Sequence, residues 1–395
     1  MFFIENIQYL SLLFLLASLL VYFISGINLI FSCIMLLNPY VSALLCFLKI
    51  FIGYLVEDRG RLNKKGLLTF LIVVSISIVP YFDSVFNLRT FAQFIQFLIL
   101  VFVLTVLILP EKAVIKKPIS LLKNLRFSCL ILAIVKIYAS IVGVQDFFLF
   151  GKNEDAMLLV LIGAVSSLYL YFRKNSFWVV FDFLILVFAI NLYESRSALF
   201  FIFLIPFFVF FCLLYSDKDR GLNKIYILLF ILFSLASLLL SLDFIFSKFG
   251  LDQANNYSNL ERLGMYFFTY DYMFSGNYFG VGIGNLDIAM EEMYSEKYIL
   301  AIYPHPHSSI LRFSLELGVV GFLLYFLFVL YLFKLSLSLL KYERYIGTVI
   351  FVFTLSILYF SLFDSIFYSF FRGILTALML CTLISLKKIT LNIGG

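Results

Sequence analysis

Apolar residues form long runs along almost the whole chain, and short polar stretches separate them. Each run is about 20 residues long, the length that a helix needs to cross a hydrocarbon core of about 30 Å. Because that core offers the backbone no water, each run is expected to be helical. The pattern predicts about twelve helices, near residues 8–25, 28–56, 67–82, 90–109, 127–150, 157–172, 177–193, 197–215, 225–246, 308–333, 345–363 and 366–386. Asn38-Pro39 could split the second of these.

The composition agrees with a membrane environment. The chain has 395 residues, of which 63% are hydrophobic and 13% are charged, against about 25% charged residues in soluble domains. The fold class predicted is an all-α integral membrane protein. The residues before the first apolar run lack the basic segment of a signal peptide, so this run is predicted to remain as a helix. A net charge of +6 does not indicate nucleic acid as a partner.

Basic residues are concentrated in alternate connections between the predicted helices. Nineteen of the 29 lie near residues 59–65, 112–126, 173–174, 218–224, 334–344 and 387–388, whereas the other connections hold only six. The positive-inside rule makes the first set cytoplasmic, and both termini with it. The chain then divides into about nine N-terminal helices (1–246), a large outer, periplasmic loop with short helices (247–307) and about three C-terminal helices (308–395).

Several arginines lie on the outer side, where this rule disfavours them. Arg196 lies at the junction of two helices, and Arg312 lies about one turn into the tenth helix. Such residues indicate a functional site, although Arg312 could simply pair with Glu316, four residues on. For Arg89 and Arg372 the favoured interpretation is a side chain that reaches the lipid headgroups.

The outer loop contains two segments that suggest a site for an anion. Ser258-Asn259-Leu260-Glu261 has the pattern of a capping box and predicts a helix that continues to about residue 273. Arg262 would lie in its first turn, where exposed amides and a cation suit phosphate; a solvated surface arginine is the alternative. Gly280–Gly284 predicts a tight or flexible turn, and residues 286–300 predict a second, amphipathic helix.

The two histidines of the chain, His305 and His307, lie where the loop returns to the membrane. The positive end of a helix dipole disfavours imidazolium, and neutral imidazole can accept a proton as a general base. A structural role and metal binding are the alternatives. Two histidines without a nearby cysteine or acidic ligand pattern make a poor metal site, and the five cysteines have no metal-ligand spacing. No metal or cofactor is predicted.

These motifs resemble those of the bacterial O-antigen polymerase and O-antigen ligase superfamily. His307-Ser308-Ser309-Ile310-Leu311, with Glu316, Gly318 and Gly321, is similar to its H-N-x-x-L…E-x-G-x-x-G signature. Ser195-Arg196-Ser197 resembles its S-R-S/T element, and Arg262 with Gly280–Gly284 resembles its R…G-x-G segment. The resemblance covers about residues 180–330. One departure is Ser308, where the family usually has asparagine.

The resemblance implies a membrane-embedded glycosyltransferase of the GT-C-like type in the bacterial inner membrane, with its site facing the periplasm. Its donor and acceptor would be oligosaccharides on undecaprenyl diphosphate, and a flippase and a chain-length regulator are expected partners. His307 would take the proton of the acceptor hydroxyl, with His305 in support. Arg196, Arg262 and Arg312 would bind the diphosphate. The supporting residues would be Ser195, Ser308, Glu316, Gly282 and Gly284.

Two alternatives to a polymerase remain open on the sequence. A ligase would transfer the finished polymer to lipid A–core, and the compact chain, with no extra soluble domain for a large acceptor, favours the polymerase. A transporter of lipid-linked sugar would use charges at the membrane midplane, for which Lys49 and Lys136 are candidates. The chain shows none of the internal repeats of transporters, and both lysines are more simply explained as paired or snorkelling residues.

Overall fold

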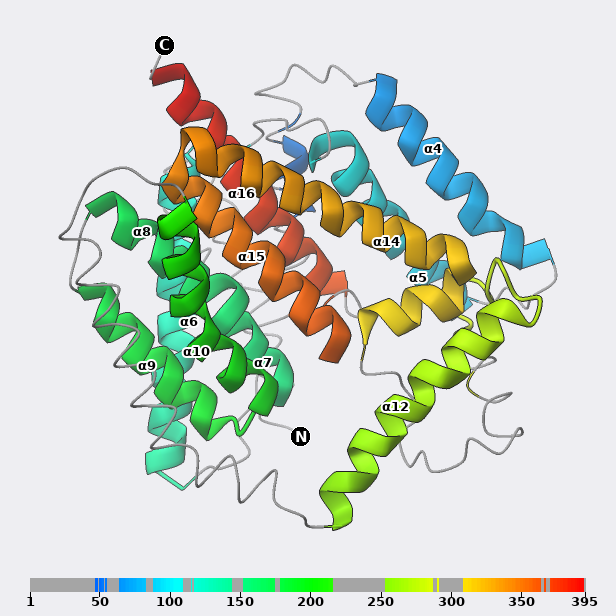
Figure 1. Ribbon diagram of the computed structural model, residues 1–395, viewed down its shortest axis with the longest axis horizontal. Coiled ribbons are helices and arrows are strands. Elements are labelled where there is room, and N and C mark those ends of the chain that lie inside the picture. Colours follow the sequence, from blue (N-terminus) through cyan, green and yellow to red (C-terminus); the bar gives the residue numbers. More distant parts are fainter. Residues whose placement is uncertain are drawn as a thin grey trace.

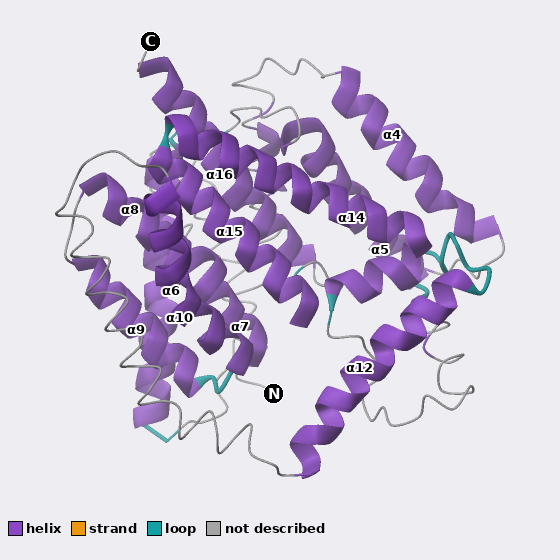
Figure 2. Cartoon of the chain, viewed as in Figure 1, coloured by secondary structure: helices purple, strands orange, loops and turns teal. Residues whose placement is uncertain are grey.

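The structure is a computed structural model of the chain, and every element that it describes is a helix (Figures 1 and 2). It describes residues 47–48, 50–52, 54, 64–82, 88–108, 115, 117–143, 152–174, 178–215, 253–286, 290, 308–363, 366 and 370–393. The helices predicted at 8–25 and 225–246, and most of the one at 28–56, lie outside these residues.

The described helices are named here in chain order. Three segments are tighter or wider than an α-helix: the 3-10 turn η1 and the π-helical segments η2 and η3. The elements are α4 (Lys64–Ile78), η1 (Val79–Phe82), α5 (Leu88–Phe102), η2 (Val103–Ile108), α6 (Pro118–Ile141), α7 (Lys152–Leu158), η3 (Leu159–Ala164), α8 (Val165–Lys174), α9 (Trp178–Leu192), α10 (Arg196–Tyr215), α12 (Gln253–Phe274), α14 (Ser309–Tyr342), α15 (Arg344–Phe363) and α16 (Phe370–Ile393).

Four helical segments among the described residues are long and apolar enough to cross a membrane. They are Pro118–Ile141, Asn153–Phe172, Ser309–Lys341 and Arg344–Leu362, and three shorter apolar helices accompany them at Thr90–Val106, Val179–Leu192 and Ser197–Cys212. Large apolar side chains such as Leu68, Phe188 and Phe211 are exposed on the outside of the bundle, as lipid-facing surfaces require. The structure therefore agrees with a membrane protein, and twelve spans stay a prediction.

The prediction of a helix at 127–150 was wrong by about nine residues, because α6 runs from Pro118 to Ile141. Pro118 occupies the start of α6, where its missing N–H costs nothing. The first turns of α6 are polar enough to hide the helix from a search for apolar runs. Arg126, which the sequence placed in a connection, lies in α6. Its guanidinium binds the carboxylate of Asp182 on α9 in a bidentate ion pair.

The core lies between α6, η3, α9, α10, α15 and α16. α14 and α15 form an antiparallel hairpin along it, and α12 lies outside this bundle and packs against α14 (Figure 1). α14 has two parts that run in different directions (Figure 1), because Gly318 interrupts it with φ 65° and ψ −153°. This break, together with the end of α15, organises the candidate site.

Candidate functional site

The motif that begins at His307 in the sequence continues into the N-terminus of α14, which Ser308 caps. Its hydroxyl oxygen accepts a hydrogen bond from the Leu311 N–H (3.3 Å) and donates one to the Ser361 carbonyl oxygen (2.9 Å) at the end of α15. Ser308 thus caps α14, a role in which serine serves as well as the asparagine that the family usually has. His305 and His307 lie outside the described residues, and the sequence places His307 directly before this cap.

Tyr266 of α12 joins the same point. Its hydroxyl donates a hydrogen bond to the Leu362 carbonyl oxygen (2.7 Å) and lies 3.5 Å from the Ser308 hydroxyl oxygen. The last turn of α15 therefore holds both α12 and the start of α14. Tyr266 was not predicted, and the available signal was its position, one helical turn after Arg262.

The end of α15 also packs against the start of α10. The Phe201 ring lies 5.7 Å from the Phe360 ring, and the Phe200 ring lies 6.1 Å from the Tyr359 ring. α10 begins at Arg196. The early part of α10, the middle of α12 and the cap of α14 are far apart in the sequence, yet all of them contact the end of α15.

The prediction that Ser258–Glu261 caps a helix was wrong. α12 begins at Gln253, so these four residues lie inside it and Arg262 lies in its third turn. The helix itself was correctly expected to run to about residue 273. Arg262 therefore lies well inside α12 along the chain, so it is not beside the exposed amides of the helix N-terminus.

The glycine segment 280–284 docks into the break in α14. Gly280, Gly282 and Gly284 all have positive φ, of 75°, 91° and 88°. The Val281 N–H donates to the Leu315 carbonyl oxygen (3.0 Å), and the Gly282 N–H donates to the Glu316 carbonyl oxygen (2.9 Å). The two glycine motifs of the signature are thus two sides of one contact.

Gly318 makes this contact possible. In an unbroken helix the Val319 N–H would bond the Leu315 carbonyl, but here it donates to the Tyr278 carbonyl oxygen (3.0 Å). The freed Leu315 carbonyl accepts the Val281 N–H instead. A Cβ on Gly318 would overlap the Tyr278 carbonyl, and one on Gly280 would overlap the Leu315 carbonyl.

Glu316 and Arg312 connect α14, the glycine segment and α5. Oε1 of Glu316 lies 2.9 Å from Nη2 of Arg312 and accepts the Gly284 N–H at 3.1 Å. The same guanidinium donates to Oε1 of Gln93 on α5 (3.3 Å). Both side chains of the ion pair are largely buried. Arg312 therefore makes the i,i+4 pair that the sequence offered as the alternative to an anion site.

Ser195 precedes the first residue of α10 and is buried. Its carbonyl oxygen accepts the Leu199 N–H (2.9 Å), which places Ser195 at the N-cap. Its hydroxyl has no hydrogen-bond partner among the residues that the structure describes. Arg196 thus stands at the positive end of the α10 dipole, a position that favours anions.

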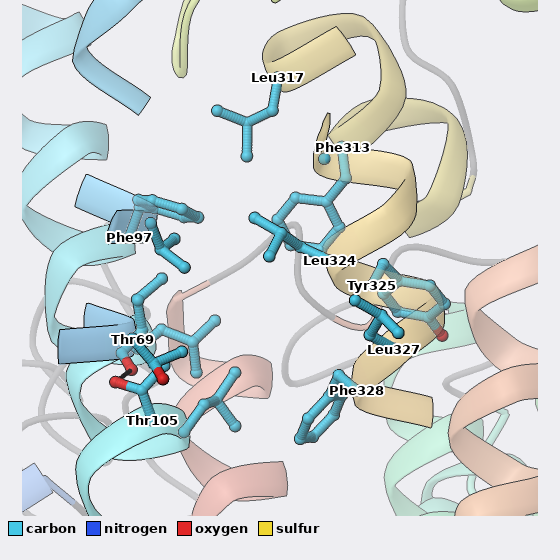
Figure 3. A pocket seen from close by; sticks show the side chains of 14 residues that line it. Thr69, Phe97, Thr105, Phe313, Leu317, Leu324, Tyr325, Leu327 and Phe328 are labelled. Carbon is cyan, nitrogen blue, oxygen red and sulfur yellow. Dashed lines mark hydrogen bonds between the residues drawn. The ribbon is translucent and has the colours of Figure 1, made fainter. Parts of the chain in front are cut away.

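An apolar cavity of about 310 Å³ lies between α4, α5, η2 and α14. Figure 3 shows Phe313, Leu317 and Tyr325 of α14 facing Phe97 and two threonines across it. The hydroxyls of Thr69 and Thr105 bond carbonyls of their own helices, so the lining suits hydrocarbon. Phe313 and Leu317 directly follow Arg312 and Glu316, which puts the ion pair beside the cavity. The described residues include no group of three side chains that could hold a metal ion.

Residues 181–326 match the protein family described as O-antigen ligase. This region starts in the first turn of α9 and ends in the second part of α14, so it contains the α9–α10 turn, α12, the glycine segment and the break at Gly318. No curated protein matches the chain. The family match bears out the resemblance to the O-antigen ligase and polymerase superfamily.

Proposed function

From the O-antigen ligase region at residues 181–326, we propose that this protein is an inner-membrane polymerase of undecaprenyl-diphosphate-linked oligosaccharide repeat units, with its site on the periplasmic face. The family and the apolar helices support a multi-pass glycosyltransferase-like membrane enzyme that acts on lipid-linked polysaccharide. The observation that carries the proposal is the meeting of α10, α12 and the α14 cap around the last turn of α15.

The proposed reaction is an inverting glycosyl transfer. His307 takes the proton from a hydroxyl of the acceptor sugar, with His305 in support. The hydroxyl oxygen attacks the anomeric carbon of the donor, and the bond from this carbon to the diphosphate oxygen breaks with its electron pair on the diphosphate. Arg196 and Arg262 stabilise that charge. Arg312 contributes less than they do, since Glu316 already neutralises it.

The apolar cavity supports a lipid-linked donor. A hydrocarbon chain that lies in it would bring the attached diphosphate to the level of Arg312 and the glycine segment, because Phe313 and Leu317 line the cavity. A soluble nucleotide-sugar donor would have no use for a pocket with this lining. The flippase and chain-length regulator remain expected partners.

A deletion strain tests the acceptor. Surface glycolipids and undecaprenyl-linked intermediates are separated side by side. Loss of the polymer ladder, with single repeat units on the lipid A–core, is the expected result. The description of the matched family favours a ligase as the second candidate. Bare cores together with long polymer on undecaprenyl diphosphate would establish the ligase and overturn the polymerase.

Variants at the α14 cap test the base. In purified protein, His307→Ala is expected to lower turnover by about 10²–10⁴-fold, the usual contribution of a general base. Ser308→Asn is the matched control, because asparagine caps helices as well as serine does. Near-normal turnover of His307→Ala would remove His307 from the proposed mechanism.

A further inference from the structure

A cluster of buried ionic groups lies beside the α9–α10 turn, and the proposed reaction does not use it. Lys136, near the end of α6, is 1% exposed, and Asp155, in the first turn of α7, is fully buried. Tyr193, the residue after α9, is also fully buried. An ionisable side chain inside a membrane protein is costly and therefore calls for a specific role.

Tyr193 interacts with both charged residues. The Nζ atom of Lys136 lies 5.0 Å from the centroid of the Tyr193 ring, which is the geometry of a cation–π interaction. The negative charge of the Asp155 carboxylate acts on the Tyr193 hydroxyl. A buried ion alone is strongly destabilising, whereas opposite charges bridged by a polar group offset each other. The three residues therefore form one unit, named here the Lys136–Tyr193–Asp155 unit.

An ion pair holds α7, the helix that carries Asp155, to α16. Arg372 of α16 binds Glu154 with 2.8 Å between Nη2 and Oε1, and its side chain is 3% exposed. The prediction that Arg372 reaches the lipid headgroups was therefore wrong. This pair connects the first turns of α7 and α16, so the helices around the unit are joined by charge as well as by apolar packing.

The turn above the unit is short and strained. The Tyr193 N–H still bonds the Ala189 carbonyl of α9, whereas Glu194 adopts φ 51°, a left-handed conformation that is uncommon for residues other than glycine. Ser195 then caps α10. Only two residues separate the Tyr193 anchor from Arg196, so a displacement of the Tyr193 ring moves the first residue of α10.

We propose that Lys136, Tyr193 and Asp155 are positioning residues that hold the α9–α10 turn so that Arg196 meets the diphosphate of the lipid-linked substrate. The inference rests on the proposed function, in which Arg196 binds that diphosphate. It also accounts for Lys136, which the sequence offered as a midplane charge of a transporter. Its ammonium group stabilises a turn at the end of the bundle, and no substrate path is needed to explain it.

Binding of undecaprenyl diphosphate to the full-length protein in lipid nanodiscs is the test. Tyr193→Phe keeps the ring over Lys136 and removes the hydroxyl that faces Asp155, and Lys136→Met removes the cation. Each is expected to weaken binding by about 10- to 100-fold, the scale of one lost hydrogen bond to a charged group. Tyr138→Phe and Lys123→Met make the same changes at exposed positions of α6 and should leave binding unchanged.

An Arg196→Ala background separates positioning from general stability. If the unit acts through Arg196, Tyr193→Phe has no further effect on binding in that background. An equal further loss there would overturn the proposal. Lys136→Met combined with Asp155→Asn removes both charges, and its folded yield should exceed that of either single variant, which guards against a result caused by misfolding.

The outcomes also separate this inference from the proposed function. If the wild-type protein binds no undecaprenyl diphosphate, the proposed function fails, and the inference fails with it. If the wild type binds it and Arg196→Ala weakens binding, but Tyr193→Phe and Lys136→Met do not, only the positioning role is wrong.

Discussion

Glu316 binds the glycine segment through both its side chain and its backbone. Its carboxylate holds a guanidinium from its own helix and an amide from the glycine segment, and its backbone carbonyl holds a second amide from that segment. Hydrogen bonds to charged groups are worth about 1.5–3 kcal/mol each. One side chain therefore fixes both the loop and the orientation of Arg312.

Glu316→Gln is expected to lower stability more than a usual polar substitution. Glutamine can still accept the Gly284 N–H, but Arg312 loses its counter-charge while it remains largely buried. Breaking a buried ion pair on one side costs about 3–5 kcal/mol, which a melting curve in detergent would register. Arg312→Met together with Glu316→Leu should melt closer to the wild type than Glu316→Gln does. A double variant less stable than the single one would contradict this account of the pair.

At this scale the sequence offered one contact as an alternative and missed the others. The Arg312–Glu316 pair follows from the spacing of four residues on one helix. The contacts of Glu316 with Gly284 and of Arg312 with Gln93 join segments that are far apart in the chain. No local pattern specifies such a partner, because its position depends on how the helices pack.

At the scale of elements, the break in α14 and the glycine segment are one structure. The break frees a carbonyl and an amide, and the segment supplies a partner for each. Isolated glycines in a helical pattern predict flexibility, whereas here they mark a close approach of two backbones. The helix start predicted at Ser258 was wrong for a related reason. The polar residues from Gln253 onward lack an apolar period and therefore suggest a loop, yet they are helical.

Gly318→Ala is expected to prevent formation of this contact. The conformation of Gly318, φ 65° and ψ −153°, is essentially restricted to glycine, and the added methyl group would overlap the Tyr278 carbonyl. We expect a loss of roughly 3 kcal/mol or more, or little folded protein. Gly264→Ala on α12 is the control, since a Cβ there meets nothing within 4 Å, and it should be neutral or slightly stabilising. Folded yield on a gel-filtration column distinguishes them.

Tyr266→Phe tests whether the end of α15 registers α12 against the start of α14. The variant loses the hydrogen bond to the Leu362 carbonyl and the contact with Ser308. A single such bond contributes about 0.5–1.5 kcal/mol to stability, so the protein should stay folded. Turnover should fall about 10-fold through misplacement of the site segments, while Tyr270→Phe, exposed on the same helix, should keep wild-type turnover. Equal turnover of both variants would show that the registration is unimportant.

At the scale of the whole molecule, apolar periodicity predicted an all-helical membrane protein, and the described helices agree with this. The family region was also predicted almost to its limits. The cavity and the Lys136–Tyr193–Asp155 unit could not be predicted. An apolar residue such as Leu, Phe or Val looks the same in a sequence whether it faces lipid, the core or an internal cavity. Only the packing of the helices distinguishes these three environments.

A larger side chain in the cavity tests whether it holds the hydrocarbon chain of the donor. Leu324 lines the cavity, and Leu324→Trp would occupy part of its volume. Phe326→Trp, at an exposed position two residues on, is the matched control. Each excluded CH₂ group costs about 0.8 kcal/mol of binding, so excluding two would raise the KM for a long-chain polyprenyl donor about 10-fold. A donor with a short prenyl chain does not need the full cavity, and its KM should change much less.

If Leu324→Trp raised both KM values equally, the cavity would not be the site of the lipid chain. If it raised only that of the long-chain donor, the apolar lining next to the Arg312–Glu316 pair would be established as the place where the lipid chain of the donor is bound.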